Sequence, residues 1–569
     1  MNILGINDGH NASACLLVNG EIRYCIQEER LTNIKNYMGF PFKSINRILQ
    51  LSNLTPEEID TIAMASVHLS VEQNVNALLS KFRERAKFKA KMKRHLKKTP
   101  LFLLYKAVKR EERLKCIDKV GFQRKKVIFV DHHLCHAAAA YYGSPWKDEK
   151  VLVLTCDGEG DFICSTVYIG ENGTLTRIAA TNQDNSLGEL YSVVTFMMGL
   201  IPYEHEYKIM GLAPYASPKR AEKCYEIFQS YLEVSRNDPL TFKRKINEPT
   251  NLMYARLKKD LEFQRFDWVA GGLQKFTEEI LCEWVKNCIK KTGIRKLVLS
   301  GGVFMNVKAN KRIMELDEVD SMFVLPSCSD ESISIGAAFH TYAQYCKEHG
   351  IKVNIPQLKE IYYGPSFTDS EVENVIKKYK NKLKFNYEYI DDIEKMIAEL
   401  LIKGEIVARC KDRMEFGARA LGNRSILADA SDLKCTRTIN MMIKNRDFWM
   451  PFAPVIMKER EHDYIVNPKN IASPYMILSF DTTDKREDLI AAIHQADFTA
   501  RPQVIEKDFN PDYYKILEEF EKKTGKGALL NTSFNLHGYP IVLGPEEAMW
   551  VFENSGLKYL ALGNYLISK

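Results

Sequence analysis

Residues 151–173 read VLVLTCDGEGDFICSTVYIGENG, and residues 1–26 read MNILGINDGHNASACLLVNGEIRYCI. Each stretch contains an apolar run, a loop with Asp-Gly, a second apolar run and an Asn-Gly dipeptide. Apolar runs separated by such dipeptides are typical of strands joined by tight hairpin turns. Because the same plan occurs twice in one chain, we predict a duplicated α/β architecture.

The segments around these copies fit the same class. Residues 126–130 form an apolar run that leads into His132 and an Ala-rich helix. Residues 297–299 lead into a tight Gly-rich turn and a helix over 306–314, and a strand over 322–325 precedes an apolar helix over 333–345. Paired acidic loops after equivalent strands are the layout of actin-like ATPase folds, in which such loops face a nucleotide.

A change in composition divides the chain. At 569 residues it is too long for one ordinary core. His349-Gly350 and Ile355-Pro356 punctuate a polar connector over residues 347–356. We therefore expect an N-terminal duplicated actin-like domain over residues 1–355 and a second α/β domain over residues 356–569.

Composition also indicates a compartment. Thirteen cysteines are scattered without a C-x-x-C pair, which favours reduced thiols in a cytoplasmic protein. The first residues lack the basic and apolar regions of a signal peptide. The longest apolar stretch, residues 192–203, is shorter than the roughly 20 residues that cross a bilayer. We expect no membrane partner.

Residues 81–126 are strongly basic, with 19 Lys or Arg against 4 Asp or Glu. One interpretation is a patch that binds nucleic acid or an anionic membrane. The other is a solvated helical excursion whose apolar residues dock on the main body. The second is favoured because no aromatic stacking pattern accompanies the basic residues, so we expect no nucleic-acid partner.

His132 and His136 lie four positions apart and so share one face of a helix, where they could bind a metal. His133 is a competing partner, and two ordinary surface histidines are the alternative. Asp157 and Asp330 each follow a strand, the usual place for an active-site carboxylate in an α/β fold. Two imidazoles and two carboxylates suit Fe(II), Mn(II) or Zn(II).

Further candidates surround this set. Asp8 and His10 follow the first strand, where His10 could take a proton from a hydroxyl while Asp8 orients it, although an incidental turn is equally consistent. Lys208 lies in a Gly/Pro-rich loop and could bind a phosphate. The turn Gly301-Gly302-Val303, followed by Asn306, would let backbone approach a nucleotide closely.

The C-terminal domain is rich in cations among apolar residues. Arginine matches phosphate oxygens bidentately, and glycine lets backbone N–H groups contribute. A solvated charged face would not need the neighbouring Phe448, Trp449 and Phe452. We therefore predict a polyanion pocket formed by Arg419, Arg424, Lys444, Arg446, Arg501, Ser533 and Asn535.

Taken together, these motifs resemble the NodU/CmcH family of O-carbamoyltransferases over essentially the whole chain. The N-terminal part resembles the actin-like transferase domain of tRNA threonylcarbamoyladenosine synthesis. The remainder resembles a YrdC-like domain, whose K-x-R and S-x-N signatures correspond to Lys444/Arg446 and Ser533/Asn535. The basic segment at 81–126 matches no catalytic motif of the family.

The resemblance implies a two-stage reaction. In the YrdC-like domain, carbamoyl phosphate loses its phosphate, and the carbamate attacks the α-phosphate of ATP to give carbamoyl adenylate and pyrophosphate. In the N-terminal domain, an acceptor hydroxyl of a small molecule then attacks the carbonyl and AMP leaves. The resemblance also implies a homodimer.

The resemblance assigns roles to matching residues. His132, His136, Asp157 and Asp330 would bind Fe(II), or else Mn or Zn. Asp8 and His10 would be the catalytic pair, and Gly301, Gly302, Val303 and Asn306 would contact the adenylate. The seven cationic and polar residues of the C-terminal pocket would hold carbamoyl phosphate, ATP and Mg²⁺.

Two other functions are consistent with parts of the pattern. A tRNA-modifying enzyme of the threonylcarbamoyladenosine type would use the basic segment to hold RNA, and its binding would weaken steeply with salt. A non-catalytic actin-like nucleotide switch would leave the His/Asp set and the C-terminal domain without a purpose. The Arg-rich stretch over residues 416–425 favours the enzyme that uses carbamoyl phosphate.

Overall fold

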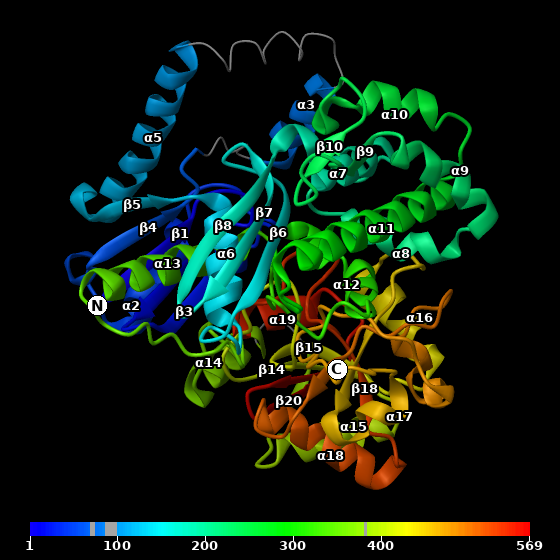
Figure 1. Ribbon diagram of the computed structural model, residues 1–569. Helices are drawn as coiled ribbons and strands as arrows, with labels where there is room; N and C mark the ends of the chain where they lie inside the picture. Colours follow the sequence, from blue (N-terminus) through cyan, green and yellow to red (C-terminus); the bar gives the residue numbers. More distant parts are fainter. Residues whose placement is uncertain (69–73, 86–99, 381–383) are drawn as a thin grey trace. The chain divides into compact units, whose positions relative to one another are not determined.

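The computed structural model describes residues 1–68, 74–85, 100–380 and 384–569 (Figure 1). The chain is a mixed α/β protein with two compact units. The first contains residues 1–28 and 36–358, and the second contains residues 29–35 and 359–569. Within the described ranges, no helix combines the length and apolar character that a membrane span requires.

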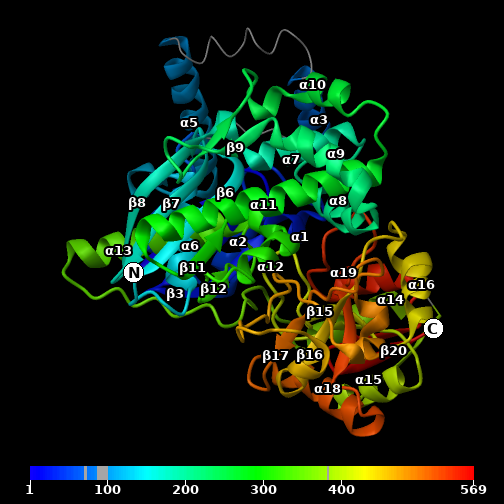
Figure 2. The same ribbon diagram turned by 45° about the vertical axis from the view of Figure 1, so that its right-hand side comes forward.

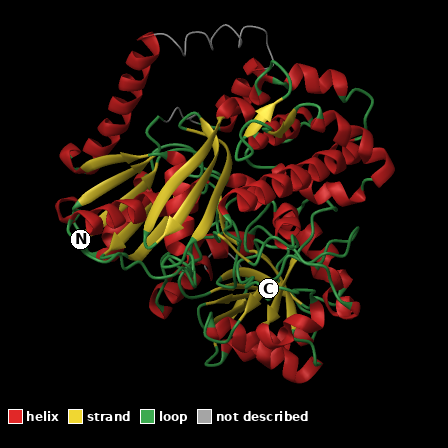
Figure 3. Cartoon of the chain, viewed as in Figure 1, coloured by secondary structure: helices red, strands yellow, loops and turns green. Residues whose placement is uncertain are grey.

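The first unit contains two five-stranded sheets of the same topology (Figure 3). Their orders are β3-β2-β1-β4-β5 and β8-β7-β6-β11-β12. In each sheet the first two pairings are antiparallel and the last two are parallel. This repeat confirms the predicted duplication. The strands are β1 (Asn2–Asn7), β2 (Ser13–Val18), β3 (Glu21–Gln27), β4 (Thr61–Ala65), β5 (Val127–Val130), β6 (Val151–Gly160), β7 (Ile163–Glu171), β8 (Thr174–Asn182), β11 (Lys296–Ser300) and β12 (Ser321–Val324).

The Asn-Gly dipeptides form the hairpin turns that the sequence predicts. Asn19 and Gly20 have φ of 51° and 90°, and Asn172 and Gly173 have φ of 48° and 71°. Positive φ at both central residues is the geometry that matches the twist of paired strands. The turns therefore fix the register of β2 with β3 and of β7 with β8.

Helices accompany both sheets of this unit, and α11 packs along α9 (Figures 1 and 2). The larger helices are α2 (Phe42–Ser52), α6 (His132–Gly143), α7 (Leu187–Met197), α9 (Pro218–Gln229), α11 (Phe266–Thr292), α12 (Val307–Met314) and α13 (Ile333–Glu348). A short helix, α8 (Glu206–Leu212), carries the predicted Lys208.

Within the basic segment, the structure describes α3 (Val75–Arg85) and α5 (Pro100–Val120). Residues 86–99 lie outside the described ranges. Leu78, Phe82 and Ile117 are buried, as the docking interpretation of this segment requires. Arg113 is also buried, with only 8 % of its surface exposed.

Two glycines allow α13 to pack closely on its neighbours. A Cβ at Gly336 would lie 1.8 Å from the carbonyl oxygen of Cys135 in α6, and a Cβ at Gly5 in β1 would lie 2.0 Å from that of Ser334. Distances this short forbid any side chain at either position. The fold therefore holds α13 against both α6 and β1 at backbone contact.

Gly336→Ala tests this packing. We expect it to lower the free energy of unfolding by about 1–3 kcal/mol, because the added methyl forces α13 away from α6. Gln344→Ala, on the exposed face of the same helix, should stay within about 0.5 kcal/mol of wild type. Urea unfolding of both variants measures the difference. Equal stability of the two would contradict the close approach.

The second unit has an eight-stranded mixed sheet in the order β13-β20-β19-β14-β15-β18-β16-β17. Helices α15 (Ile393–Ile402) and α18 (Pro511–Thr524) bury an apolar core that includes Leu401, Phe520 and Leu529. The YrdC-like identity of this unit stays a prediction. The strands are β13 (Asn386–Tyr389), β14 (Val407–Cys410), β15 (Arg424–Ala428), β16 (Ala453–Met457), β17 (Gln503–Ile505), β18 (Ala528–Ser533), β19 (Tyr559–Leu562) and β20 (Tyr565–Ser568), and the other helices include α14 (Asp369–Lys380), α16 (Leu433–Ile439) and α19 (Pro545–Glu553).

Candidate functional site

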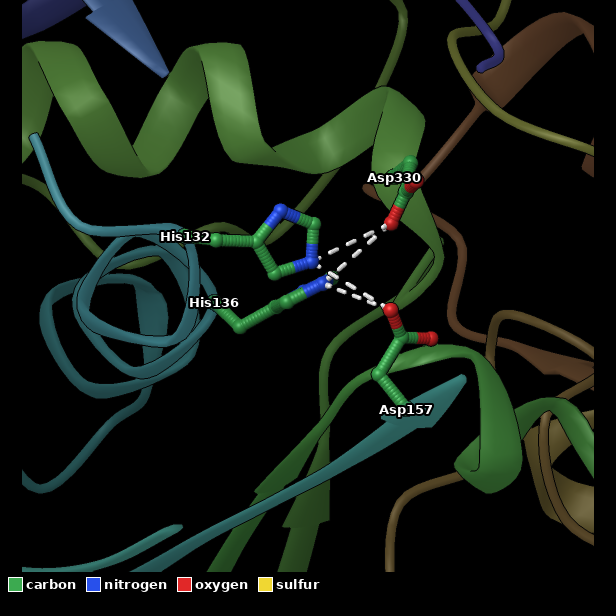
Figure 4. Close-up of side chains that lie close together, drawn as sticks. All are labelled: His132, His136, Asp157 and Asp330. Carbon is green, nitrogen blue, oxygen red and sulfur yellow. Dashed lines mark hydrogen bonds and ion pairs between the residues drawn. The ribbon is translucent and has the colours of Figure 1, made fainter. Parts of the chain in front are cut away.

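Four side chains of the first unit point toward one another (Figure 4). The Nε2 atoms of His132 and His136 lie 3.3 and 3.9 Å from Asp157 Oδ2. The same nitrogens lie 3.6 and 3.4 Å from Asp330 Oδ1. All four candidate ligand atoms lie within 4.8 Å of one another. The structure therefore brings together the two imidazoles and two carboxylates that the sequence singled out.

Local structure positions each ligand. Asp131 caps α6 by accepting the Leu134 N–H, so the helix starts at the first histidine and presents His132 and His136 one turn apart. Asp157 lies on β6, beside the parallel strand β11. Asp330 opens the short 3-10 turn that precedes α13.

Hydrogen bonds orient the ligands from behind. His132 Nδ1 lies 2.9 Å from the Ser66 hydroxyl, and His136 Nδ1 lies 3.3 Å from the Ser300 hydroxyl. The Gly302 N–H donates to Asp157 Oδ1 at 2.9 Å. These partners engage the atoms that face away from the common centre, the arrangement that holds metal-binding imidazoles in one tautomer and orientation.

The free atoms fit a metal ion. Among the described residues, His136 Nε2 and Asp330 Oδ1 are buried and have no hydrogen-bond partner, which is costly unless an ion completes the site. Burial lowers the pKa of His132, but Asp157 and Asp330 outweigh it and raise the pKa to about 9. Burial raises the pKa of Asp157, and the histidines reverse that effect and lower it below its usual value. The site therefore attracts positive charge strongly.

His133 is excluded as a ligand by its own contacts. Its Nδ1 lies 2.7 Å from the Thr155 hydroxyl, and its Nε2 lies 3.0 Å from the carbonyl oxygen of Ile163. The carbonyl oxygen can only accept, so His133 Nε2 carries a proton and cannot bind a metal ion. Burial lowers the pKa of His133 well below its ordinary value, with the neighbouring histidines adding to the effect.

Metal analysis of two variants distinguishes the histidines. We expect about one transition ion per chain in the wild type, and its loss in His136→Ala, because one of the four candidate ligands is removed. His133→Gln keeps a donor and an acceptor at the adjacent position and should retain the ion. Elemental analysis of the purified proteins gives the result. Equal metal content in the two variants would contradict the assignment.

Asn7 organises the loop that holds the predicted catalytic pair. Its side-chain NH₂ donates to the carbonyl oxygens of His10 at 2.8 Å and of Asp330 at 2.9 Å, and its amide oxygen accepts the Gly9 N–H. The His10 loop and the Asp330 ligand are thereby tied to one side chain. The His10 ring meets Tyr203 edge-on, with 5.8 Å between ring centroids.

Asp8 has a partner that the sequence did not indicate. Both of its carboxylate oxygens accept from the Arg113 guanidinium, at 2.7 and 2.8 Å. This is a bidentate ion pair in a buried environment, so its geometry is well defined. Asp8 thus holds Arg113 in place, and its role in orienting His10 stays a prediction.

The predicted adenylate contacts lie near the end of β11. Gly301 has φ of +101°, and a Cβ there would lie 2.3 Å from the Cys156 carbonyl oxygen, so only glycine fits. Asn306 caps α12 through the Ala309 N–H and exchanges two hydrogen bonds with Gln274. Its side chain therefore stabilises the start of α12, and the contact of Gly301, Gly302, Val303 and Asn306 with an adenylate stays a prediction.

Lys208 lies in α8, where it is 8 % exposed. The sequence placed Lys208 in a loop, whereas the structure places it inside this short helix. Its contact with a phosphate stays a prediction. Nearby Tyr203 has φ of +63°, which is rare for a bulky residue and stores backbone strain. Its hydroxyl donates to Glu189, which also pairs with Arg85 at 2.7 Å.

In the second unit, Lys444 meets the two residues of the S-x-N motif. Its ammonium donates to the Ser533 carbonyl oxygen, to the Ser533 hydroxyl at 3.0 Å and to Asn535 Oδ1 at 2.5 Å. Lys444 ends a five-residue π-helix (Asn440–Lys444), and such bulges often mark functional sites. Burial lowers its pKa well below the ordinary value, and nearby Arg446 and Lys35 add to the effect.

Three arginines lie close to one another, and one of them, Arg446, also lies near Lys444. Burial lowers the pKa of Arg501 well below its ordinary value, and Arg419 and Arg446 lower it further by repulsion. Arg446 stacks on the Phe452 ring, 3.9 Å from its centroid. Buried cations that repel one another are stabilised when an anion enters between them. These residues can therefore bind a polyanion.

Arg424 has a structural task. It is fully buried. Its five N–H groups donate to carbonyl oxygens of Leu543, Lys411, Asn423, Asp412 and Pro365. With every donor used on backbone, the guanidinium has none left for a phosphate. The sequence analysis placed Arg424 in the anion pocket because its neighbours are small. Small neighbours equally suit a buried arginine that links loops through their carbonyl oxygens.

Sequence reasoning missed the residues that orient the ligands. The role of Ser300 could have been predicted, because Ser300 ends a strand just before the Gly-Gly turn. No local sequence pattern indicated the roles of Ser66, Asn7 and Arg113, because these roles depend on which strand ends lie side by side in the fold. The need for glycine at position 160 was missed as well. A Cβ there would lie 2.1 Å from the His132 ring, so a side chain would displace this ligand.

Comparison with known proteins gives family matches over most of the chain. The family described as "Carbamoyltransferase N-terminus" matches residues 2–339, and "Carbamoyltransferase C-terminus" matches residues 398–569. The chain is 30 % identical to Nodulation protein NolNO of Sinorhizobium fredii, over 98 % of this chain and 79 % of that protein. It is 30 % identical to protein sll1178 of Synechocystis, over 100 % and 97 % of the two chains. A phosphate- and nucleotide-bound structure of full-length HypF covers 60 % of this chain and 55 % of its own, with 14 % identity and a TM-score of 0.35.

Proposed function

Because the chain belongs to the carbamoyltransferase family, we propose that it is an ATP-dependent O-carbamoyltransferase acting on a hydroxyl of a small molecule. The observation that carries this proposal is the pairing of two chemically different sites, one in each unit. A His/Asp cluster suited to a metal lies in the first, and buried cations suited to phosphates lie in the second.

The first half-reaction belongs to the second unit. Water releases phosphate from carbamoyl phosphate, and the carbamate oxygen then attacks the α-phosphorus of ATP, giving carbamoyl adenylate and pyrophosphate. Lys444, Arg446, Arg501 and Arg419 neutralise the charge that develops on the phosphate oxygens, and Mg²⁺ accompanies ATP. Ser533 and Asn535 hold the Lys444 ammonium in place.

Arg446→Ala tests this assignment. We expect the release of pyrophosphate from ATP and carbamoyl phosphate to fall by about 100-fold or more, because a preorganised charge at the phosphates is lost. Arg437→Ala removes an exposed arginine nine positions earlier and should leave the rate unchanged. A coupled pyrophosphate assay measures both variants. Normal release by Arg446→Ala would remove this pocket from the reaction.

The second half-reaction belongs to the first unit. The acceptor hydroxyl loses a proton to His10 and attacks the carbamoyl carbonyl, and AMP leaves. His132, His136, Asp157 and Asp330 would hold Fe(II), or Mn(II) or Zn(II), which supplies Lewis-acid polarisation of the carbonyl when bound. Gly301 and Gly302 let the backbone come close to the adenylate, and Asn7 fixes the His10 loop beside Asp330.

The acceptor is proposed to be a small hydroxylated metabolite, such as an antibiotic, a sugar or a saxitoxin-type alkaloid. Support comes from the relatives whose names place them in nodulation. The match to carbamoyltransferases over both parts of the chain favours this function over tRNA modification. A screen of hydroxylated metabolites for the mass gain of one carbamoyl group would identify the acceptor.

His10→Ala separates the two half-reactions. We expect pyrophosphate release to continue at the wild-type rate, while AMP release that depends on an acceptor falls by about 100-fold or more. His349→Ala, at an exposed position of the same unit, should retain both activities. Mass spectrometry of the acceptor and a nucleotide assay give the two rates. Full transfer by His10→Ala would rule out the general-base role.

A further inference from the structure

The guanidinium of Arg113, in α5, donates hydrogen bonds to residues at the ends of two neighbouring strands. Nε and one Nη donate to the two oxygens of Asp8 at 2.7 and 2.8 Å, directly after β1. The Nη groups also donate to the carbonyl oxygens of Ala65 and Ser66 at 2.8 and 2.7 Å, at the end of β4. Because β1 and β4 pair in parallel, one arginine binds both loops.

Ser66 is the second member of this arrangement. It is buried and has φ of +66°, a left-handed conformation that a serine adopts only when its surroundings hold it there. Arg113 binds its carbonyl oxygen, and its hydroxyl lies 2.9 Å from His132 Nδ1. Arg113 and the predicted metal ligand thus contact two different groups of the same strained residue, its carbonyl oxygen and its hydroxyl.

Asp161 fixes the adjoining backbone. Its carboxylate accepts from the N–H groups of Val67 and His68, at 2.9 and 2.6 Å, and from the N–H of His132 at 2.8 Å. The conformation of the Ser66 loop is therefore determined from both ends. The Arg113 guanidinium holds one end, and the Asp161 carboxylate holds the other end next to the first metal ligand.

We propose that Arg113 is a positioning residue of the metal site, which acts through Ser66 to set the orientation of the His132 imidazole. It also holds Asp8 two residues before His10. The inference rests on the proposed metal site and transfer step, and it gives the basic segment a role in the chemistry of the first unit. Among the described residues, Arg113 is hydrogen-bonded to Asp8 of the predicted catalytic pair and to none of the four predicted metal ligands.

The other described helix of the basic segment makes a parallel contribution. Arg85, the last residue of α3, pairs with Glu189 at 2.7 Å and with Glu159 at 3.1 Å. Glu159 lies two residues beyond the ligand Asp157. Helices α3 and α5 thus each direct an arginine to the end of a strand, next to a predicted metal-binding or catalytic residue.

Titration of the full-length, metal-free chain with Mn²⁺ tests the proposal. Arg113→Lys keeps the charge, but one ammonium cannot span a carboxylate and two carbonyl oxygens. We expect it to weaken Mn²⁺ binding by about 10–100-fold, the usual range for a partner behind a ligand. Arg110→Lys, one turn earlier and also stacked on Phe129, should bind Mn²⁺ as the wild type does.

A double-mutant cycle shows whether the effect passes through Ser66. Ser66→Ala should weaken binding by a similar factor, and adding Arg113→Lys to it should weaken binding by no more than about threefold further. Wild-type affinity in Arg113→Lys, or two losses that multiply in full, would overturn the inference while the metal site stands. A wild-type chain that takes up no Mn²⁺ would remove the metal site itself, and the inference with it. If Arg113→Lys does not fold, normal affinity in Ser66→Ala overturns the proposal.

Discussion

The geometry of the candidate metal site depends on the backbone contact between α6 and α13. The first helix carries His132 and His136, and the second begins directly after the turn that carries Asp330. At Gly336 there is no space for even one methyl group, so the backbones of the two helices are in direct contact there. That contact converts a sequence separation of nearly 200 residues into a nitrogen–oxygen distance of 3.4 Å. A metal site needs ligands placed to a few tenths of an ångström, and a glycine contact supplies this precision better than flexible side chains could.

The pKa values of buried groups shift in opposite directions in the two units, and each direction indicates the charge of a ligand. In the first, carboxylates raise the pKa of His132 to about 9, so the cluster favours a positive charge. In the second, burial and positive neighbours lower the pKa values of Lys444 and Arg501. A buried group whose charge is disfavoured gains most from an oppositely charged ligand. The charges therefore favour a cation in the first unit and a polyanion in the second.

The sequence was sufficient for features that depend on local spacing. The Asn-Gly pairs predicted the hairpin turns. The spacing of the two histidines predicted that they share one helical face. The positions of the aspartates after strands predicted the two carboxylates of the cluster. It was insufficient where a role depends on distant neighbours. The residues next to Arg424 in the sequence are typical of a phosphate-binding arginine, yet its guanidinium donates to five backbone carbonyl oxygens. Ser66 and Arg113 meet only because β1 and β4 pair and α5 docks beside them, and neither fact follows from residues near 66 or 113.

The basic segment shows why net charge is a poor guide to a partner. Nineteen cations within residues 81–126 are consistent with an anion-binding surface, yet Arg85 and Arg113 point inward and pair with Glu189 and Asp8. A buried ion pair contributes little net stability, because desolvation offsets the attraction, while loss of one partner leaves a buried charge and is costly. Such pairs are better suited to fixing geometry than to adding free energy. Both arginines therefore make more sense as constraints on the backbone around the candidate site than as contributions to stability or to nucleic-acid binding.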